Sequence, residues 1–102
     1  MNGDVLQKIV KVRSRLNYGV KMTVKGVSMQ PTFNDGDKVS IRAKRRYFVG
    51  DIVVYEYKNE GFLVHRIIDI KGDQYLCKGD NAIRIEEVLL SNIIGAAMHF
   101  QA

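Results

Sequence analysis

Ser28 is held in a short stretch that could present its hydroxyl for chemistry. It lies between two apolar residues in Lys25-Gly26-Val27-Ser28-Met29-Gln30-Pro31-Thr32, directly after the alternating segment 22–25. A serine becomes a nucleophile only with a base within hydrogen-bond reach, roughly 2.6–3.2 Å, and with donors for the oxyanion of an attacked carbonyl. Gly26 leaves room for backbone N–H groups to approach a substrate. Because a loop serine is also common in a plain turn, the rest of the chain must supply the base.

His65 is the candidate base. Alternation in residues 62–68 places Leu63, His65 and Ile67 on one face of an expected strand. A histidine in such an apolar row is often a buried core residue, but an imidazole can also take the proton of a serine hydroxyl. The other histidine, His99, has no charged neighbour in the sequence and is expected to be structural.

Asp80, in the segment Lys78-Gly79-Asp80-Asn81, is the preferred carboxylate partner of the base. A carboxylate would fix the tautomer of the histidine and stabilise its cation. However, Gly-Asp pairs also occur at 3–4, 36–37, 50–51 and 72–73, so the chain uses this pair in turns as well. Glu86 and Glu87 are the alternatives for the same role, and a dyad without a carboxylate is a third.

The elements that must position these residues begin with one helix. Apolar residues recur at helical spacing from residue 4 to about residue 17, at Val5, Ile9, Val12 and Leu16, with Leu6 and Val10 alongside. We expect residues 1–20 to form a helix packed on the domain. Because lysines and arginines lie on its other face, peripheral contact of this basic amphipathic helix with a membrane is the alternative.

Beyond residue 20 the period changes to two. Alternating or strongly β-favouring segments at 22–25, 38–42, 52–57, 62–70, 74–78 and 93–100 are separated by turn residues, whereas residues 83–90 carry no clear pattern. The sequence therefore predicts a mainly β protein, in which residues 21–102 form a compact, mostly antiparallel β domain and the chain is a single domain overall.

The composition limits the classes of protein that remain. The chain has 102 residues, a net charge of +5 and a single cysteine, Cys77, which fits one small domain in a reducing compartment. No stretch is apolar enough to cross a bilayer, and charges interrupt the N-terminal segment, so a cytoplasmic location is expected. No metal-ligand or cofactor motif is present, and the basic clusters lack the pattern of a nucleic-acid binder, so neither a cofactor nor a nucleic-acid partner is expected.

Five segments in order resemble the conserved boxes of type I signal peptidases. They are Gly26-x-Ser28-Met29-x-Pro31-Thr32, Asp35-Gly36-Asp37, Gly50-Asp51-Ile52-Val53, Val64-His65-Arg66-Ile67 and Lys78-Gly79-Asp80-Asn81. Over about residues 22–97 the chain is similar to the S24/S26 serine peptidases, and a histidine where most bacterial members have a lysine makes it similar to their Ser-His branch. The resemblance implies the coiled β fold shared with LexA.

The same resemblance implies the roles of the site residues. Ser28 would be the nucleophile and His65 its base, with Asp80 orienting His65. Residues around the serine, among them Gly26, Met29 and Pro31, would form the oxyanion hole and bind substrate. The chain departs from the family in two respects: it has a charged helix where signal peptidases have a membrane anchor, and residues 82–87 lack the Asp that often serves the histidine.

The function that these expectations favour is a serine endopeptidase that cleaves a leader, signal or propeptide. Two alternatives stay open: a catalytically inactive module of the same fold that binds a peptide or protein, and a self-processing regulatory domain of the LexA type.

Overall fold

The computed structural model describes residues 3–15 and 19–100. One helix is followed by seven strands in these ranges: α1 (Gly3–Arg15), β1 (Val20–Thr23), β2 (Lys38–Arg42), β3 (Ile52–Glu56), β4 (Phe62–Lys71), β5 (Gln74–Lys78), β6 (Ile85–Leu89) and β7 (Ile93–His99), with a 3-10 turn η1 (Leu90–Asn92) before β7. The strands form one antiparallel sheet in the order β1-β2-β7-β3-β4-β5-β6. The mainly β, antiparallel fold class predicted above is confirmed.

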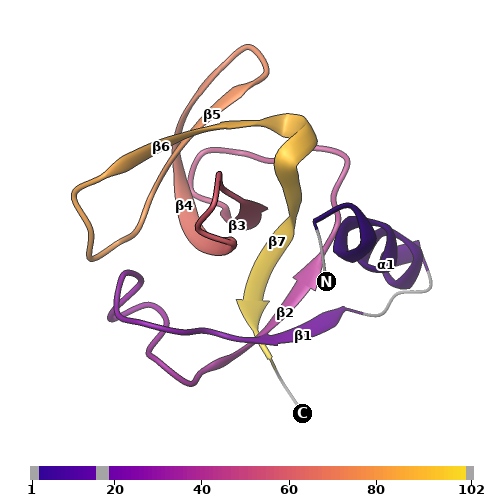
Figure 1. The fold of residues 1–102 in the computed structure, drawn as a ribbon, viewed down its shortest axis with the longest axis horizontal. Coiled ribbons are helices and arrows are strands. Elements are labelled where there is room, and N and C mark those ends of the chain that lie inside the picture. The colour runs from indigo at the N-terminus through magenta and orange to yellow at the C-terminus, as the bar shows by residue number, and fades with distance from the viewer. Residues whose placement is uncertain (1–2, 16–18, 101–102) are drawn as a thin grey trace.

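The sheet is strongly coiled, so that β5 and β6 lie at the opposite end of the molecule from α1 (Figure 1). Helix α1 packs against β7, β2 and β1. The coiling brings the segment after β1 close to β4, although β1 and β4 are not neighbours in the sheet. This approach is what assembles the site described below.

The apolar residues of α1 that face the sheet are not the ones that recur most regularly at helical spacing in the sequence. Leu6 and Val10 are 6% and 0% exposed, whereas Val5, Ile9 and Val12 are 46%, 36% and 54% exposed. Helical spacing identifies an apolar arc, but the sheet determines which part of that arc is covered. The predicted end of the helix near residue 17 lies outside the described residues. No helix in the described ranges is long and apolar enough to cross a membrane.

Two hydrophobic clusters fill the interior. The first joins α1 to β2 and β7 and includes two residues that follow the serine, Met29 and Phe33, which are 1% and 2% exposed. The second lies under β3, β4 and β5 and includes Tyr55 and Cys77. The serine loop is therefore anchored in the first cluster, while the strand that carries His65 is supported by the second.

Strand β6 is the element that the sequence did not predict. Its buried residues are Glu86 and Val88, while Ile85 and Leu89 are half exposed. Because one inward position carries a carboxylate and apolar residues point outward, the usual alternation is obscured.

Candidate active site

The loop that carries Ser28 is fixed by its own turns. Gly26 adopts a φ of +86°, a left-handed conformation that glycine tolerates, and its N–H donates to Asp35 Oδ1 at 2.7 Å. Beyond it, the Gln30 amide donates to the Val27 carbonyl at 3.2 Å. The buried side chain of Met29 then ties the turn to the core. The local sequence thus leaves Ser28 half-buried at the tip of a rigid turn.

The segment Gly79–Asn81 holds this loop from the other side. The backbone N–H of Asn81 donates to the Ser28 carbonyl at 2.7 Å, and its side-chain amide donates to the Val27 carbonyl at 3.1 Å. A Cβ at Gly79 would lie 2.6 Å from the Ser28 carbonyl oxygen. Only glycine therefore permits the observed approach of the two segments.

The sequence predicted that Asp80 would contact His65, but Asp80 bonds to other residues. Its carboxylate accepts two hydrogen bonds from Arg66, from Nε and Nη2, both at 2.8 Å, and a third from Thr32 Oγ1 at 2.6 Å. Consecutive residues of a strand point to opposite faces, so Arg66 draws Asp80 to the face of β4 opposite His65. The paired Arg66 guanidinium, helped by Thr32, lowers the pKa of Asp80 to about 2. The contact expected of Asp80 is made by Glu86, one of the two alternatives.

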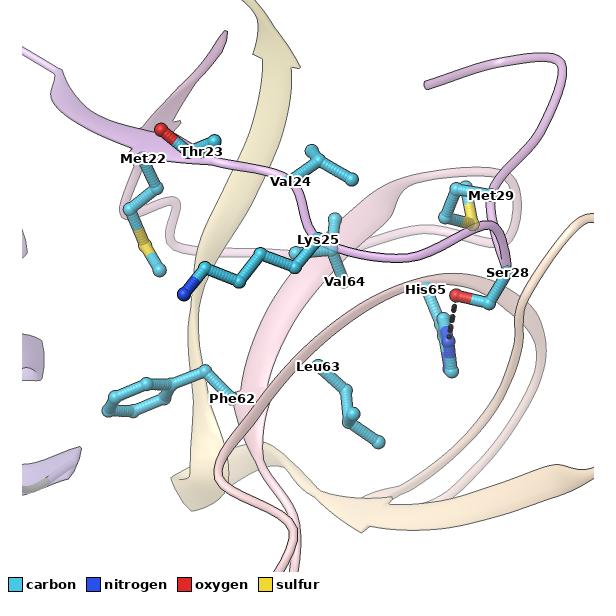
Figure 2. A pocket seen from close by; sticks show the side chains of 10 residues that line it. All are labelled: Met22, Thr23, Val24, Lys25, Ser28, Met29, Phe62, Leu63, Val64 and His65. Carbon is cyan, nitrogen blue, oxygen red and sulfur yellow. Dashed lines mark hydrogen bonds between the residues drawn. The ribbon is translucent and has the colours of Figure 1, made fainter. Parts of the chain in front are cut away.

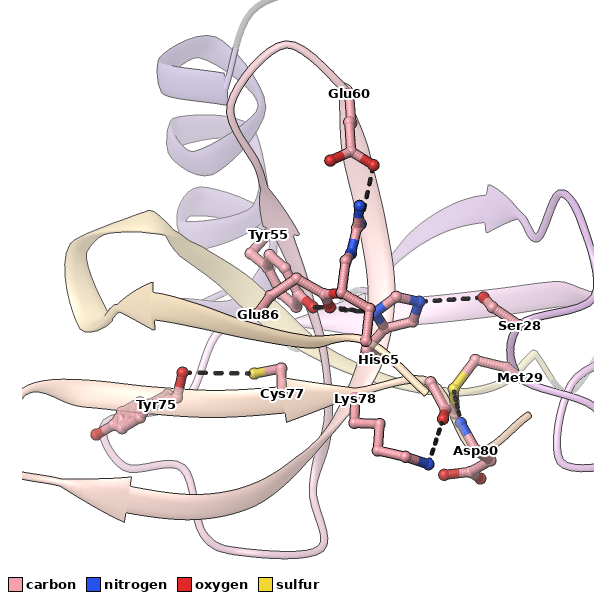
Figure 3. Close-up of polar contacts among 12 residues, drawn as sticks. Ser28, Met29, Tyr55, Glu60, His65, Tyr75, Cys77, Lys78, Asp80 and Glu86 are labelled. Atoms are coloured by element: carbon pink, nitrogen blue, oxygen red, sulfur yellow. Dashed lines mark hydrogen bonds and ion pairs between the residues drawn. The ribbon is translucent and has the colours of Figure 1, made fainter. Parts of the chain in front are cut away.

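His65 lies between the serine and that glutamate. Its Nε2 is 3.0 Å from Ser28 Oγ, and its Nδ1 is 2.6 Å from Glu86 Oε1 (Figure 3). His65 is 5% exposed and Glu86 is 1% exposed, so water has little access to the pair. Ser28 and His65, which the sequence predicted from separate segments, are in hydrogen-bond contact.

The protonation of Glu86 sets the tautomer of the histidine. Burial by itself raises the pKa of the Glu86 carboxyl, but hydrogen bonds from Tyr55, Arg84 and His65 outweigh it and leave the pKa below its ordinary value. An ionised Glu86 can only accept, so Nδ1 of a neutral His65 carries the proton and donates it. Nε2 then presents a lone pair to the Ser28 hydroxyl, which is the arrangement that a general base requires.

Two further side chains complete the surroundings of Glu86. The Tyr55 hydroxyl, on β3, donates to Glu86 Oε1 at 2.6 Å, and Arg84 Nε donates to Glu86 Oε2 at 2.8 Å. Neither residue was singled out from the sequence. A signal existed for Arg84, because it is a cation only two residues before Glu86 in the sequence. A tyrosine in the apolar segment 52–55 also implies a buried partner for its hydroxyl.

A groove of about 340 Å³ opens in front of Ser28 and His65. Two segments form its walls (Figure 2). One is segment 22–25, which comprises the last two residues of β1 and the two that follow, and the other is segment 62–65, the first part of β4. Most of the lining side chains are apolar, and the side chain of Lys25 lies across the groove. The complete lining consists of Met22, Thr23, Val24, Lys25, Ser28, Met29, Phe62, Leu63, Val64 and His65. Strand β5 pairs with β4 only from Arg66 onward, so segment 62–65 has no strand on that edge in the described part of the chain.

Only some of the other residues considered from the sequence lie at the groove. Met29 lines the groove, whereas Gly26 and Pro31 are not among its lining residues. His99 lies away from Ser28: its Nε2 is 3.0 Å from the Thr32 carbonyl and its ring stands edge-on to Phe33 at 4.5 Å between centroids. These contacts fit the structural role expected of His99.

Comparison with known proteins places the chain in a family. The model of the Peptidase S24-like family matches residues 5–98. No curated protein gives a significant match to the sequence. The family match begins within α1 and ends within β7, so it includes the Ser28–His65–Glu86 hydrogen-bond chain. On this match, and with the antiparallel fold and the segments noted above, the chain belongs to the Peptidase S24-like family.

Proposed function

We propose that the protein is a serine endopeptidase that cleaves a leader, signal or propeptide, with Ser28 as nucleophile and His65 as general base. The observation that carries the proposal is the continuous hydrogen-bond chain from Ser28 Oγ through His65 to the buried Glu86 carboxylate. In this chain Glu86 takes the orienting role expected of Asp80.

The reaction follows from the directions of these hydrogen bonds. Ser28 Oγ attacks the scissile carbonyl while its proton passes to His65 Nε2, and Glu86 stabilises the imidazolium that forms. His65 then returns the proton to the leaving amine, which leaves an acyl group on Ser28. Water, deprotonated by the same imidazole, hydrolyses that ester and restores the free serine.

The oxyanion of each tetrahedral intermediate needs hydrogen-bond donors from the serine loop. The backbone N–H of Ser28 donates to no acceptor in the described part of the chain, so it is available for this purpose. The hydrogen bonds of Asn81 to the Ser28 and Val27 carbonyls hold this loop in place. The donor therefore needs little reorganisation during the reaction.

The groove supports binding of the substrate as an extended chain. Segment 62–65 offers a strand edge that β5 leaves unpaired, and segment 22–25 forms the opposite wall. A peptide that adds to such an edge gains main-chain hydrogen bonds, while alternate side chains enter the apolar lining. A leader or propeptide, which is extended and accessible, suits this mode of binding.

A fluorophosphonate probe tests the proposal without knowledge of the substrate. The wild type should be labelled, and Ser28→Ala should not be. Ser91→Ala, which alters an exposed serine of η1, is the matched control and should be labelled like the wild type. His65→Ala should lower the labelling rate at least 100-fold, in line with the usual contribution of a general base.

The outcomes separate the rival functions. Equal labelling of wild type and Ser28→Ala would remove Ser28 as the nucleophile. A wild type that binds peptides but is neither labelled nor able to cleave a peptide library would indicate the inactive binding module. Cleavage of its own chain, detected by intact mass and abolished in Ser28→Ala, would indicate a self-processing domain.

A further inference from the structure

The carboxylate of Glu86 receives more hydrogen bonds than the proposed mechanism requires. Orientation of His65 needs one acceptor, Oε1, which lies 2.6 Å from Nδ1. The hydroxyl of Tyr55 donates to the same oxygen at 2.6 Å, and Arg84 Nε donates to the other oxygen at 2.8 Å. These two extra donors come from β3 and from the residue before β6.

Burial explains why the extra donors matter for the charge of Glu86. Glu86 is 1% exposed and Tyr55 is 0% exposed, so water cannot solvate the carboxylate. A buried carboxylate without enough donors takes up a proton, and it could then no longer accept from Nδ1. Burial, followed by the neighbouring Glu86, raises the pKa of the Tyr55 hydroxyl, so this hydroxyl stays protonated and remains a donor.

The donors also divide the negative charge of Glu86. Tyr55 and His65 share one oxygen, and the Tyr55 hydroxyl is only 3.1 Å from Nδ1. Arg84 brings a full positive charge to the second oxygen. A carboxylate that is polarised toward other donors attracts the proton of an imidazolium less strongly than one bonded to the histidine alone.

Arg84 is itself held in place. Its Nη2 donates to Glu60 Oε1 at 2.9 Å, and its guanidinium lies 5.5 Å from the ring centroid of Tyr57. Both partners lie at the turn between β3 and β4. The side chain of Arg84 is 54% exposed, so it can be substituted with little disturbance of the core.

The remaining groups around His65 do not add a competing charge on this side. Cys77, on β5, lies beside Tyr55 and Glu86, and burial raises the pKa of its thiol to about 12, so it is neutral. Ser28 faces Nε2. Lys25 lines the groove with His65, on the side open to solvent.

We propose that Tyr55 and Arg84 are positioning residues of the site: they hold the Glu86 carboxylate against His65 Nδ1 and limit the share of its charge that His65 receives. The tautomer of the imidazole then remains fixed, with Nε2 directed at the Ser28 hydroxyl whose proton it would accept. This inference rests on the proposed Ser-His peptidase mechanism, but its physical content, the charge sharing, can be measured without catalysis.

The experiment is an NMR titration of the His65 imidazole in Tyr55→Phe and in Arg84→Gln. Each single variant removes one donor from Glu86, so the titration midpoint should rise by about one pH unit, a tenfold increase in proton affinity. The two donors that remain in each single variant keep Glu86 ionised. Tyr75→Phe, at another buried tyrosine, and Arg46→Gln, at an exposed arginine, are matched controls and should leave the midpoint unchanged.

A second readout is the pH dependence of fluorophosphonate labelling, whose acidic limb should move upward by the same amount as the NMR midpoint. A merely structural role would lower the labelling rate without moving this limb. Unchanged or lowered midpoints in folded Arg84→Gln and Tyr55→Phe would overturn the charge sharing. A rise in midpoint in a protein that the probe does not label would overturn the proposed peptidase while leaving the charge sharing intact.

Discussion

The role of Glu86 is best tested by Glu86→Gln, which removes the charge and keeps the shape of the side chain. In the wild type, Oε1 accepts from two buried donors, His65 and Tyr55, whereas Oε2 accepts from the exposed Arg84. A glutamine has only one acceptor oxygen. That oxygen should stay with the two buried donors, because Arg84 can turn to water and they cannot.

This orientation determines the expected magnitude. Because the amide oxygen still accepts from Nδ1, the tautomer of His65 is kept and only the charge is lost. A hydrogen bond to a charged group contributes about 1.5–3 kcal/mol. At about 1.4 kcal/mol for each factor of ten, the labelling rate at neutral pH should fall about 10- to 100-fold. A switch of tautomer would cost far more, up to about 10⁴-fold.

The assay is the second-order rate constant of fluorophosphonate labelling across pH, with Asp80→Asn as the matched carboxylate-to-amide control. In Glu86→Gln the imidazolium loses its counter-charge, so the acidic limb of the profile should move to lower pH. In Asp80→Asn this limb should stay in place, since Asp80 bonds to Arg66 and Thr32. A wild-type rate and profile in Glu86→Gln, or a shifted limb in Asp80→Asn alone, would refute the assignment of Glu86.

Two further substitutions probe the segment that holds the serine loop. Gly79→Ala should reduce labelling at least tenfold and destabilise the fold by about 1–3 kcal/mol in urea denaturation, because its Cβ would lie 2.6 Å from the Ser28 carbonyl oxygen; wild-type labelling would contradict the close approach. Arg66 lowers the pKa of Asp80 to about 2, so the stability that this pair contributes is present above about pH 4 and is lost as the pH falls toward 2. Asp80→Asn should therefore show a smaller loss of urea resistance than the wild type between pH 4 and pH 2, and equal losses would contradict the ion pair's contribution.

The fold was predictable wherever the hydrophobic pattern reported burial directly. Strand β2, for example, alternates between the fully buried Val39 and Ile41 and outward polar residues. The prediction failed at β6, because its inward Glu86 breaks the alternation that identifies a strand. It was incomplete at α1, where only the packed sheet determines that Leu6 and Val10 face inward.

Within the site, the contact between Ser28 and His65 was predicted from the order of the sequence segments and is present. Of the carboxylates considered for His65, the alternative Glu86 makes the contact and the preferred Asp80 does not, because a sequence does not state toward which face of a strand a loop residue reaches. Asp80 follows β5 in a turn and meets Arg66, whereas Glu86 lies on β6, opposite Cys77 in the register with β5. That register directs Glu86 to the His65 face of β4.

The two carboxylates therefore have different partners on the two faces of β4: Asp80 binds Arg66, and Glu86 binds His65. The charge of Asp80 is neutralised by a bidentate arginine, so it has little to offer an imidazolium. Its contact with Thr32 instead ties the serine loop to Arg66, the residue next to His65 in the chain. Asp80 thus links the serine loop to β4 on one face, while Glu86 accepts from His65 Nδ1 on the other. We therefore expect loss of Asp80 to loosen the contact between Ser28 and His65 without altering the titration of His65.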